Sequence, residues 1–295
     1  MSGPLEGKAI VLTGASRGLG AATARALAEA GASLVLNARD GARLDALCAE
    51  LGSERVLAAP GSVAEEDVAA RCVSQCVEAF GRIDVLINNA GIVRDRTTLK
   101  MTAEEFDDVI AVNLRGTWLC GREAARAMRE SGGGHLINVI SNVAFHGSVG
   151  QSNYAASKSA AASLTRSWAY ELERYGIRAN ALWPIAMTDM TEVVVQRAAE
   201  QARSEGAPEP TAQTIGLGDP NEVAKVLVFM SSDGASELNG QVVTFNGGRL
   251  ALWTHPKEVQ VSEQESWTLD EIGGYFATAQ QEPMYEPKLS PLPGV

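Results

Sequence analysis

The chain has 295 residues, of which 45% are hydrophobic, and this is enough for one large domain or two modest ones. Its formal charge of −11 gives an acidic surface, which repels phosphate backbones and anionic lipid and argues against nucleic acid or a membrane as partner. The N-terminus lacks a basic region followed by a long apolar core, and no apolar run approaches the roughly 18 residues that span a bilayer, so we expect a cytoplasmic protein. Four cysteines without a metal-ligand pattern predict reduced, half-buried thiols and no metal site: Cys48, Cys72, Cys76 and Cys120.

Short runs rich in Val, Ile and Leu alternate along the chain with longer Ala-rich stretches of helical period. Such alternation, with strands that are almost wholly apolar, predicts a parallel sheet with helices on both faces. We predict a Rossmann-type, doubly wound α/β fold of about seven strands in a single domain over residues 1–249. The expected strands lie within residues 8–14, 33–38, 55–59, 84–91, 135–141, 178–183 and 240–248.

Two segments fall outside this alternation. Residues 186–216 form an insertion after the sixth strand whose helical pattern suits a substrate lid; the alternative is a surface helix followed by a loop. Residues 250–295 form a C-terminal extension, in which Thr268 and Glu271 have the spacing of a capping box and predict the start of a short helix. Four prolines between residues 283 and 293 then prevent regular structure. The extension is either a disordered end or a cover for a neighbouring subunit.

The stretch TGASRGLG follows the first predicted strand and opens the first predicted helix. Its three glycines allow a tight turn and a close approach of the backbone to a ligand. Free N–H groups and the helix dipole would then bind a pyrophosphate, whereas the alternative is a glycine-rich turn without a ligand. We expect a dinucleotide at this loop, bound by Gly14, Ser16, Arg17, Gly18, Leu19 and Gly20.

The end of the second strand indicates which dinucleotide binds. An acidic residue at this place suits NAD because it accepts from the ribose 2′-hydroxyl, whereas a nearby arginine suits the 2′-phosphate of NADP. Here Ala38 stands where the acid is expected and Arg39 follows it, while Arg17 offers a second cation. NADP(H) is therefore favoured, although Asp40, one or two positions late, leaves room for NAD(H). The alternative for both arginines is simple solvation.

The motif NNAG, residues 88–91, follows the fourth strand, and Ser141, Tyr154 and Lys158 come later in the chain. Together with the glycine loop, these motifs stand in the order found in short-chain dehydrogenases/reductases, and residues 6–248 resemble that family. The resemblance implies a dinucleotide-binding and catalytic domain that transfers a hydride reversibly between a nicotinamide and a carbonyl–alcohol pair. An epimerase or dehydratase is disfavoured by the glycine spacing.

The resemblance also implies residue roles. Tyr154 would protonate the alkoxide during reduction, and Lys158 would lower the pKa of this tyrosine, about 10 in the free residue, and hold the ribose hydroxyls. Ser141 would donate a hydrogen bond to the carbonyl oxygen. Asn113 would hold a water that links the lysine to solvent, unless its role is purely structural. The cofactor groove would be lined by Asn89, Ala90 and Gly91, with Tyr154 and Lys158.

Three features depart from the family pattern. Ser62, followed by Val63, stands where an aspartate usually contacts adenine. After the sixth strand, Ile185 follows Pro184 in place of a glycine, and the segment before Thr188 is one residue short. We still expect these five residues to meet the cofactor. The C-terminal extension is the third departure, and with the altered segment it motivates a rival hypothesis, a non-catalytic dinucleotide-binding regulator.

Substrate choice is expected to come from the loop after Ser141, from Trp183 and from the insertion. These residues are mostly apolar, so we expect a medium-sized hydrophobic ketone, aldehyde or secondary alcohol. Loop solvation is the alternative for His146, and a place in the sheet core is the alternative for Trp183. The expected substrate-binding residues are Val143, Phe145, His146, Trp183 and Met187, with Met190 and Val193 further along the insertion.

The resemblance further implies a homodimer or homotetramer. Its subunits would meet through the helix that carries Tyr154 and through the helix before it, over roughly residues 104–131. Small side chains permit close helix contact, and on the former helix these are Ala155, Ala156, Ala160, Ala161 and Ala162.

Overall fold

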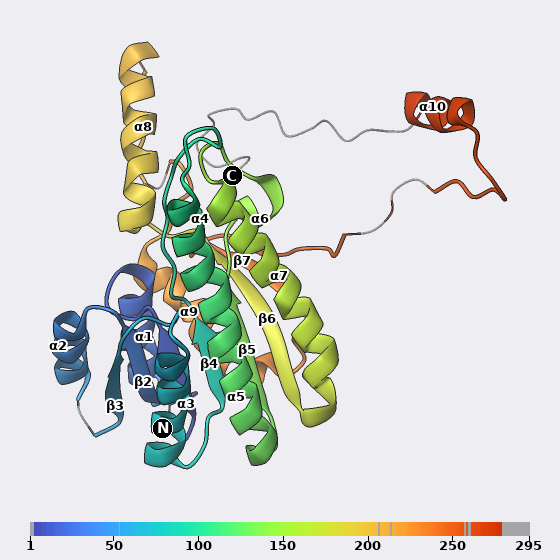
Figure 1. Ribbon diagram of the computed structural model, residues 1–295. Helices are drawn as coiled ribbons and strands as arrows, with labels where there is room; N and C mark the ends of the chain where they lie inside the picture. Colours follow the sequence, from blue (N-terminus) through green and yellow to red (C-terminus); the bar gives the residue numbers. More distant parts are fainter. Residues whose placement is uncertain are drawn as a thin grey trace.

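The computed structural model describes residues 3–278, apart from residues 53, 206, 213, 257, 259 and 260. Within this part of the chain a sheet of eight strands has the order β3-β2-β1-β4-β5-β6-β7-β8 (Figure 1). The first seven strands are parallel and β8 is antiparallel to β7. The doubly wound prediction is therefore confirmed, with one strand more than expected. The strands are β1 (Ala9–Thr13), β2 (Ser33–Ala38), β3 (Val56–Pro60), β4 (Val85–Asn88), β5 (Gly134–Val139), β6 (Ile177–Pro184), β7 (Val242–Phe245) and β8 (Leu250–Leu252).

Helices cover both faces of the sheet (Figure 1). Helices α1, α2 and α9 pack on one face, and α3, α5 and α7 pack on the other. No helix in the described part of the chain is long and apolar enough to cross a membrane. The helices are α1 (Gly18–Glu29), α2 (Gly41–Leu51), α3 (Glu66–Phe80), α4 (Ala103–Ile110), a π-helical turn (Ala111–Gly116), α5 (Thr117–Ser131), α6 (Val143–His146), α7 (Ser152–Leu172), α8 (Asp189–Glu205), α9 (Pro220–Ser231) and α10 (Leu269–Thr278), with 3₁₀ turns at Glu173–Tyr175 and Asp233–Ala235.

Strand β1 lies inside the sheet and contributes side chains to both hydrophobic cores. Ile10 and Leu12 point to the core under α1 and α9, whereas Ala9 and Val11 point to the core under α3 and α5. This follows from the two-residue period of a strand. Burial of each branched side chain contributes about 2 kcal/mol relative to exposure, so a strand that is apolar at every position is stable only between two helical layers.

The eighth strand belongs to the segment that we treated as a C-terminal extension. It pairs with β7 through Val243 opposite Leu252 and Phe245 opposite Leu250, so the extension begins as part of the sheet. Both leucines of β8 are largely exposed. Because β8 is only three residues long and lies at an edge of the sheet, it has no periodic sequence pattern from which it could be predicted.

The two segments outside the predicted alternation contain helices. The insertion is closed at its base by a bridge between Ala186 and Gly218, and α8 projects from the carboxyl edge of the sheet (Figure 1). The capping box is confirmed, since Thr268 Oγ1 accepts from Glu271 N and the Glu271 carboxylate accepts from Thr268 N at the start of α10. The proline-rich residues 279–295, and the side chains of Met190 and Val193, lie outside the described residues.

The expected subunit contact on α7 and the expected burial of the cysteines can both be compared with the structure. Ala161 and Ala162 were expected at a subunit contact, but both are buried against Trp183 and the sheet. That expectation was wrong because alanine occurs on both faces of α7, so composition does not tell which face is inward. The four cysteines are free, and they are more completely buried than the half-buried thiols that we expected. Burial raises the pKa of Cys72 and Cys76 to about 12, so these thiols stay protonated.

A buried histidine joins β5 to β6 and α9. His135 Nδ1 lies 2.9 Å from the Met230 carbonyl oxygen, and its Nε2 lies 2.8 Å from the amide nitrogen of Asn180. Burial lowers the pKa of His135 to about 3, and the charge of Arg178 acts in the same direction. The folded protein therefore holds a neutral imidazole where the unfolded chain would take up a proton below about pH 6.5.

This histidine makes stability depend on pH. Its contribution is fully present above about pH 6.5 and is lost as the pH falls towards 3, with a slope of roughly 1.4 kcal/mol per pH unit. We expect His135→Gln to unfold more easily at neutral pH but to lose less further stability on acidification. Urea unfolding from about pH 7 to about pH 5 measures both slopes. The exposed His255 is the control: His255→Gln should keep the wild-type slope, and equal slopes in all three proteins would contradict the assignment.

Candidate active site

Four of the predicted motifs follow neighbouring parallel strands. The glycine loop follows β1, residues 89–91 follow β4, Ser141 follows β5 and Ile185 follows β6. Because the carboxyl ends of parallel strands meet at one edge of a sheet, all four segments lie at that edge. The strand order changes direction between β1 and β4, and a crevice for a ligand is expected at this switch point.

The glycine loop packs directly on the end of β4. Gly14 and Gly18 have φ of +67° and +51°, a region that residues with a side chain rarely adopt. A Cβ added to Gly14 would lie 2.7 Å from Ala90 Cα, and one added to Gly20 would lie 2.0 Å from the Gly14 carbonyl oxygen. The loop therefore closes only with glycine at these positions.

Thr13 and Asn89 hold this loop against β4. Thr13 Oγ1 accepts from the backbone N–H groups of Asn89 and Ala90, both at 3.1 Å. In return, Asn89 Nδ2 donates to the carbonyl oxygens of Thr13 at 3.1 Å and Gly14 at 3.0 Å. The predicted groove residue Asn89 thus braces the loop with its side chain. Sequence reasoning missed Thr13, although it directly precedes the first glycine of the motif.

The start of α1 suits a dinucleotide. Arg17, at the N-cap, makes no side-chain capping bond, and the first turn contains no acidic residue. The helix start therefore offers backbone donors and the positive end of its dipole to an anion. Across the loop, a Cβ added to Gly18 would lie 3.5 Å from Thr188 Cγ2, which places Thr188 beside the same loop. The cradle fits the pyrophosphate of NAD(P).

The residues expected at the adenosine end have distinct environments. Arg39 is exposed, whereas Asp40 caps α2 by accepting from Arg43 N at 3.1 Å and also pairs with the Arg43 guanidinium. Ser62 Oγ accepts from Ala64 N at 3.4 Å and helps to turn the chain. Val63 is buried against Gly116, where an added Cβ would lie 2.6 Å from Val63 Cγ2.

Helix α7 carries Tyr154 and Lys158 one turn apart, with Lys158 Nζ 5.7 Å from the centroid of the tyrosine ring. The lysine is only 4% exposed, and its Nζ donates to the Val139 carbonyl oxygen at 2.7 Å. A Cβ added to Gly91 would lie 3.7 Å from the same nitrogen. Burial lowers the pKa of Lys158 to about 8. The ammonium group therefore lies between the ends of β4 and β5, beside the tyrosine.

Tyr154 lies close enough to Ser141 for the serine hydroxyl to act on the phenol. Burial raises the pKa of Tyr154 to about 12; Ser141 acts against this rise, and the charge of Asp95 adds to it. The groups of the protein alone thus move the pKa in the direction opposite to the one expected from Lys158. Ser141 Oγ also donates to Asn142 Oδ1 at 2.9 Å, so its hydroxyl is held in place.

Asn113 lies in the π-helical turn and is fully buried. Its Oδ1 accepts from Ile92 N at 2.8 Å, and its Nδ2 donates to the Ile92 carbonyl oxygen at 3.0 Å and to Ser157 Oγ at 3.3 Å. Ser157 Oγ in turn donates to the Tyr154 carbonyl oxygen at 2.8 Å. The side chain of Asn113 therefore ties the segment after β4 to the helix of the tyrosine.

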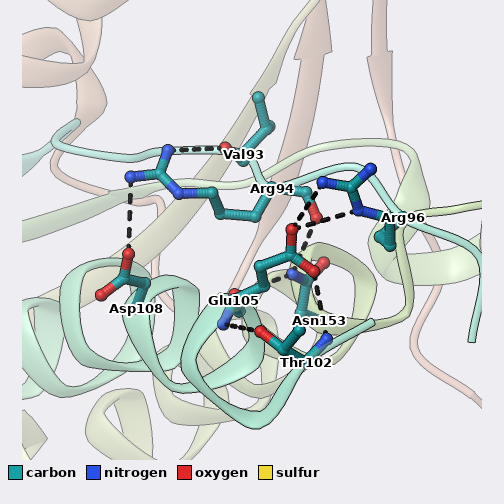
Figure 2. Close-up of polar contacts among 7 residues, drawn as sticks. All are labelled: Val93, Arg94, Arg96, Thr102, Glu105, Asp108 and Asn153. Atoms are coloured by element: carbon teal, nitrogen blue, oxygen red, sulfur yellow. Dashed lines mark hydrogen bonds and ion pairs between the residues drawn. The ribbon is translucent and has the colours of Figure 1, made fainter. Parts of the chain in front are cut away.

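A second set of contacts fixes the segment after β4, as Figure 2 shows. Asn153 Nδ2 donates to the carbonyl oxygens of Arg94 and Glu105, both at 3.1 Å. Glu105 also pairs with Arg96 at 2.9 Å and completes a capping box with Thr102 at the start of α4. Sequence reasoning missed these residues, although Thr102 and Glu105 carry the readable capping-box spacing.

The predicted substrate residues lie on α6 and beside it. Val143 is buried, while Phe145 and His146 face a tryptophan that sequence reasoning missed, Trp253, just after β8. Trp183 is buried and contacts the same tryptophan, so it belongs to the sheet core, the alternative considered for it. Met187 lines a recess of about 350 Å³ together with residues of α8.

The altered segment after β6 is built into the fold. Ile185 N donates to the Phe245 carbonyl oxygen at 2.9 Å, and its own carbonyl oxygen accepts from Gly218 N at 3.0 Å. Its side chain is buried in the cluster that contains Trp183. Both polar backbone groups of Ile185 are thus used within the protein, whereas the neighbouring Pro184 is partly buried at the end of β6.

Comparisons with known proteins identify the family to which the chain belongs. A family model described as short chain dehydrogenase matches residues 8–201. A 3-oxoacyl-acyl-carrier-protein reductase of Thermotoga maritima is 38% identical over 83% of this chain and 98% of its own. Hydroxyacyl-CoA dehydrogenase ChsB1 of Mycobacterium tuberculosis is 38% identical over 85% and 81%. The crystal structure of a short chain dehydrogenase from Mycobacterium avium has a TM-score of 0.76 at 33% identity, covering 93% of this chain and 95% of that one.

The chain therefore belongs to the short-chain dehydrogenase family, as its motifs predicted. It is an NAD(P)-dependent oxidoreductase on a Rossmann-type fold.

The glycine loop gives a direct test of the cofactor cradle. In Gly20→Ala the added methyl group would overlap the Gly14 carbonyl, so the loop must shift. We expect the Kd for NAD(P)H to rise at least about tenfold, measured by titration of cofactor fluorescence, with circular dichroism as a check on folding. The matched control is Gly273→Ala on α10, where an added Cβ meets nothing within 4 Å. Wild-type affinity in Gly20→Ala would contradict the placement of the cofactor at this loop.

Proposed function

We propose that the protein transfers a hydride reversibly between NADP(H) and a hydrophobic ketone or secondary alcohol, with Tyr154 as the general acid and base. The observation that carries this proposal is the meeting of Ser141, Tyr154 and Lys158 at the same sheet edge as the glycine loop. The nicotinamide would be held by Lys158 and the segment that ends in Thr188, and when bound it supplies or accepts the hydride.

The protein's own groups manage the proton and the developing charge. Ser141 turns its hydroxyl proton from Asn142 Oδ1 to the carbonyl oxygen, where negative charge develops, and Tyr154 gives its phenolic proton to that oxygen during reduction. A pKa of about 12 keeps the phenol protonated at neutral pH, as a general acid must be. Lys158, with a pKa of about 8, is largely charged at neutral pH and favours the phenolate that remains. In oxidation the same groups act in reverse order.

Asn113 and Asn153 serve this chemistry as positioning residues. Asn113 connects Ile92 to Ser157, and Asn153 connects the same segment to α4. Asn153 lies on the helix that carries Tyr154, and Asn113 donates to Ser157 on the same helix, so both amides hold the phenol in register with the segment after β4. The role of Asn113 in holding a water stays a prediction.

Replacement of the phenol tests the mechanism. In Tyr154→Phe the acid is lost while the ring remains, so turnover should fall at least about 100-fold and the Kd for NADPH should change less than about threefold. Absorbance of NADPH with a panel of hydrophobic ketones measures the first quantity, and fluorescence titration the second. Tyr170→Phe is the matched control on the same helix, because Tyr170 is 83% exposed. Equal turnover by Tyr154→Phe and wild type would refute the role of Tyr154, whereas a wild-type protein that binds NADPH but reduces no ketone would favour the regulatory alternative.

The preference for NADP(H) is supported by the end of β2. Arg39 is exposed and makes no hydrogen bond or ion pair within the described residues, so it is available to a 2′-phosphate. Asp40, the residue that left room for NAD(H), is occupied as the cap of α2. Arg17 lies in the loop that faces the same cofactor. An arginine suits this task because its planar group binds phosphate oxygens in pairs.

Cofactor choice follows from Arg39 in a measurable way. We expect Arg39→Ala to raise the Kd for NADPH about tenfold and to leave the Kd for NADH within about twofold, since only the former carries the 2′-phosphate. Fluorescence titration with both cofactors measures the ratio. Arg25→Ala is the control, because Arg25 pairs with Glu50 on the outer side of α1 and α2. Equal losses for both cofactors in Arg39→Ala would contradict a phosphate-binding role.

The substrate would enter beside α8. Met187 and Val195 line the recess there, and Val143, Phe145 and His146 lie on α6 after Ser141. Glu192, Gln196, Glu200, Arg203 and Glu209 also line this recess, so the support for a hydrophobic carbonyl compound comes from the apolar side chains of α6, with α8 as a lid over the site. The two curated relatives are named for oxoacyl and hydroxyacyl substrates, so acyl thioesters belong in the ketone panel. His146 would then be the polar group near the substrate oxygen.

We also propose a homodimer or homotetramer in the cytoplasm. The outer face of α5 and α7 holds a recess of about 250 Å³ lined by Trp118, Arg122, Trp168 and Tyr175, among others. Arg122 lies over the Trp118 ring, which is itself partly exposed. A tryptophan and arginine surface of this kind is typical of the centre of a protein interface.

A further inference from the structure

Trp253 is fixed at the edge of the sheet by two hydrogen bonds. Its backbone N–H donates to the Val242 carbonyl oxygen at 3.0 Å, and its indole Nε1 donates to Thr244 Oγ1 at 2.5 Å. Thr244 is fully buried in β7. The indole is therefore held in one orientation by the sheet itself, with its one polar group satisfied.

Three aromatic side chains pack around this indole. Phe145 stacks on it with ring centroids 5.0 Å apart and planes 11° apart. His146 meets it edge-on at 5.7 Å, and Trp183 lies tilted against it at 5.1 Å. Offset stacks and edge-on contacts at these distances are favourable beyond the area that they bury. Phe145 remains 36% exposed, so part of its side chain stays accessible to a ligand.

The stack holds one side of a short helix, whose other side packs on α7 and buries Val143. Helix α6 is a single turn, and a turn of this length does not persist on its own. On its other side, Ser159 Oγ donates to the Ala144 carbonyl oxygen at 2.8 Å, which ties α6 to α7. Trp253 supplies the contact on the side of the sheet edge. The position of α6, which begins two residues after Ser141, therefore depends in part on a residue of the C-terminal extension.

We propose that Trp253 is a specificity-determining residue, which holds α6 so that Phe145 and His146 form an aromatic wall of the substrate site. This inference rests on the proposed ketone reduction. Aromatic faces attract flat rings more than flexible chains because stacking needs a planar partner. The site therefore selects ketones with a flat aromatic ring over linear ones, and Trp253 acts on substrate binding rather than on the proton transfer.

The test compares three variants on two ketones. Trp253→Ala removes the stack, Trp253→Phe retains a ring without the indole donor, and Trp267→Ala removes a tryptophan of the same extension that contacts Tyr275 instead. The ketones are 2-tetralone, which is flat and bicyclic, and 2-octanone, which is linear. For each protein we would measure KM, kcat, the Kd for NADPH and the Tm.

In Trp253→Ala we expect the KM for 2-tetralone to rise about tenfold while kcat and the Kd for NADPH stay within about twofold. The KM for 2-octanone should rise less than about threefold, and Trp253→Phe should restore most of the loss. Trp267→Ala should match wild type. Equal KM values in Trp253→Ala and Trp267→Ala, or a parallel loss of NADPH affinity, would overturn the proposal.

A second measurement separates this inference from the proposed function. If wild type reduces neither ketone, calorimetric titration of 2-tetralone into the NADPH-bound protein replaces KM. Weaker binding to Trp253→Ala than to Trp267→Ala would then support the aromatic wall although the reductase function had failed. Equal binding would overturn it.

Discussion

The burial of one ammonium group organises the site. Lys158 is almost entirely removed from water, which is costly for a charge unless it finds strong partners. The Val139 carbonyl at the end of β5 provides such a partner at 2.7 Å. Because this carbonyl belongs to the sheet, the lysine is fixed relative to the strand ends, and one turn earlier on the same helix Tyr154 is fixed with it.

Side-chain amides complete this arrangement. Asn89 braces the glycine loop, Asn113 braces the segment after β4, and Asn153 joins that segment to α4. In each case the amide bonds to backbone groups of a loop that has no ladder of its own. An amide both donates and accepts, so the buried Asn113 satisfies both the N–H and the carbonyl group of Ile92. The side-chain amides therefore hold these loops in place without additional strand pairing.

Much of the fold was readable from the sequence because most strand residues are apolar and each helix has its own period. The catalytic residues could be predicted as well, because the order and spacing of their motifs are visible in the sequence without knowledge of the packing. The features that could not be predicted depend on burial, or on contacts between segments that are far apart in the sequence. The direction of the pKa of Tyr154 follows from burial, the inward face of Ala161 follows from helix packing, and Trp253 enters the site only through the antiparallel β8.

The buried thiols have a practical consequence. None of the four cysteines is accessible, and burial keeps Cys72 and Cys76 in the unreactive thiol form at ordinary pH. Alkylating dyes and spin labels attack the thiolate, so the native chain offers them no competing target. A single cysteine introduced on the surface of α8 would therefore carry a probe cleanly, and motion of that helix could be followed in a background-free spectrum.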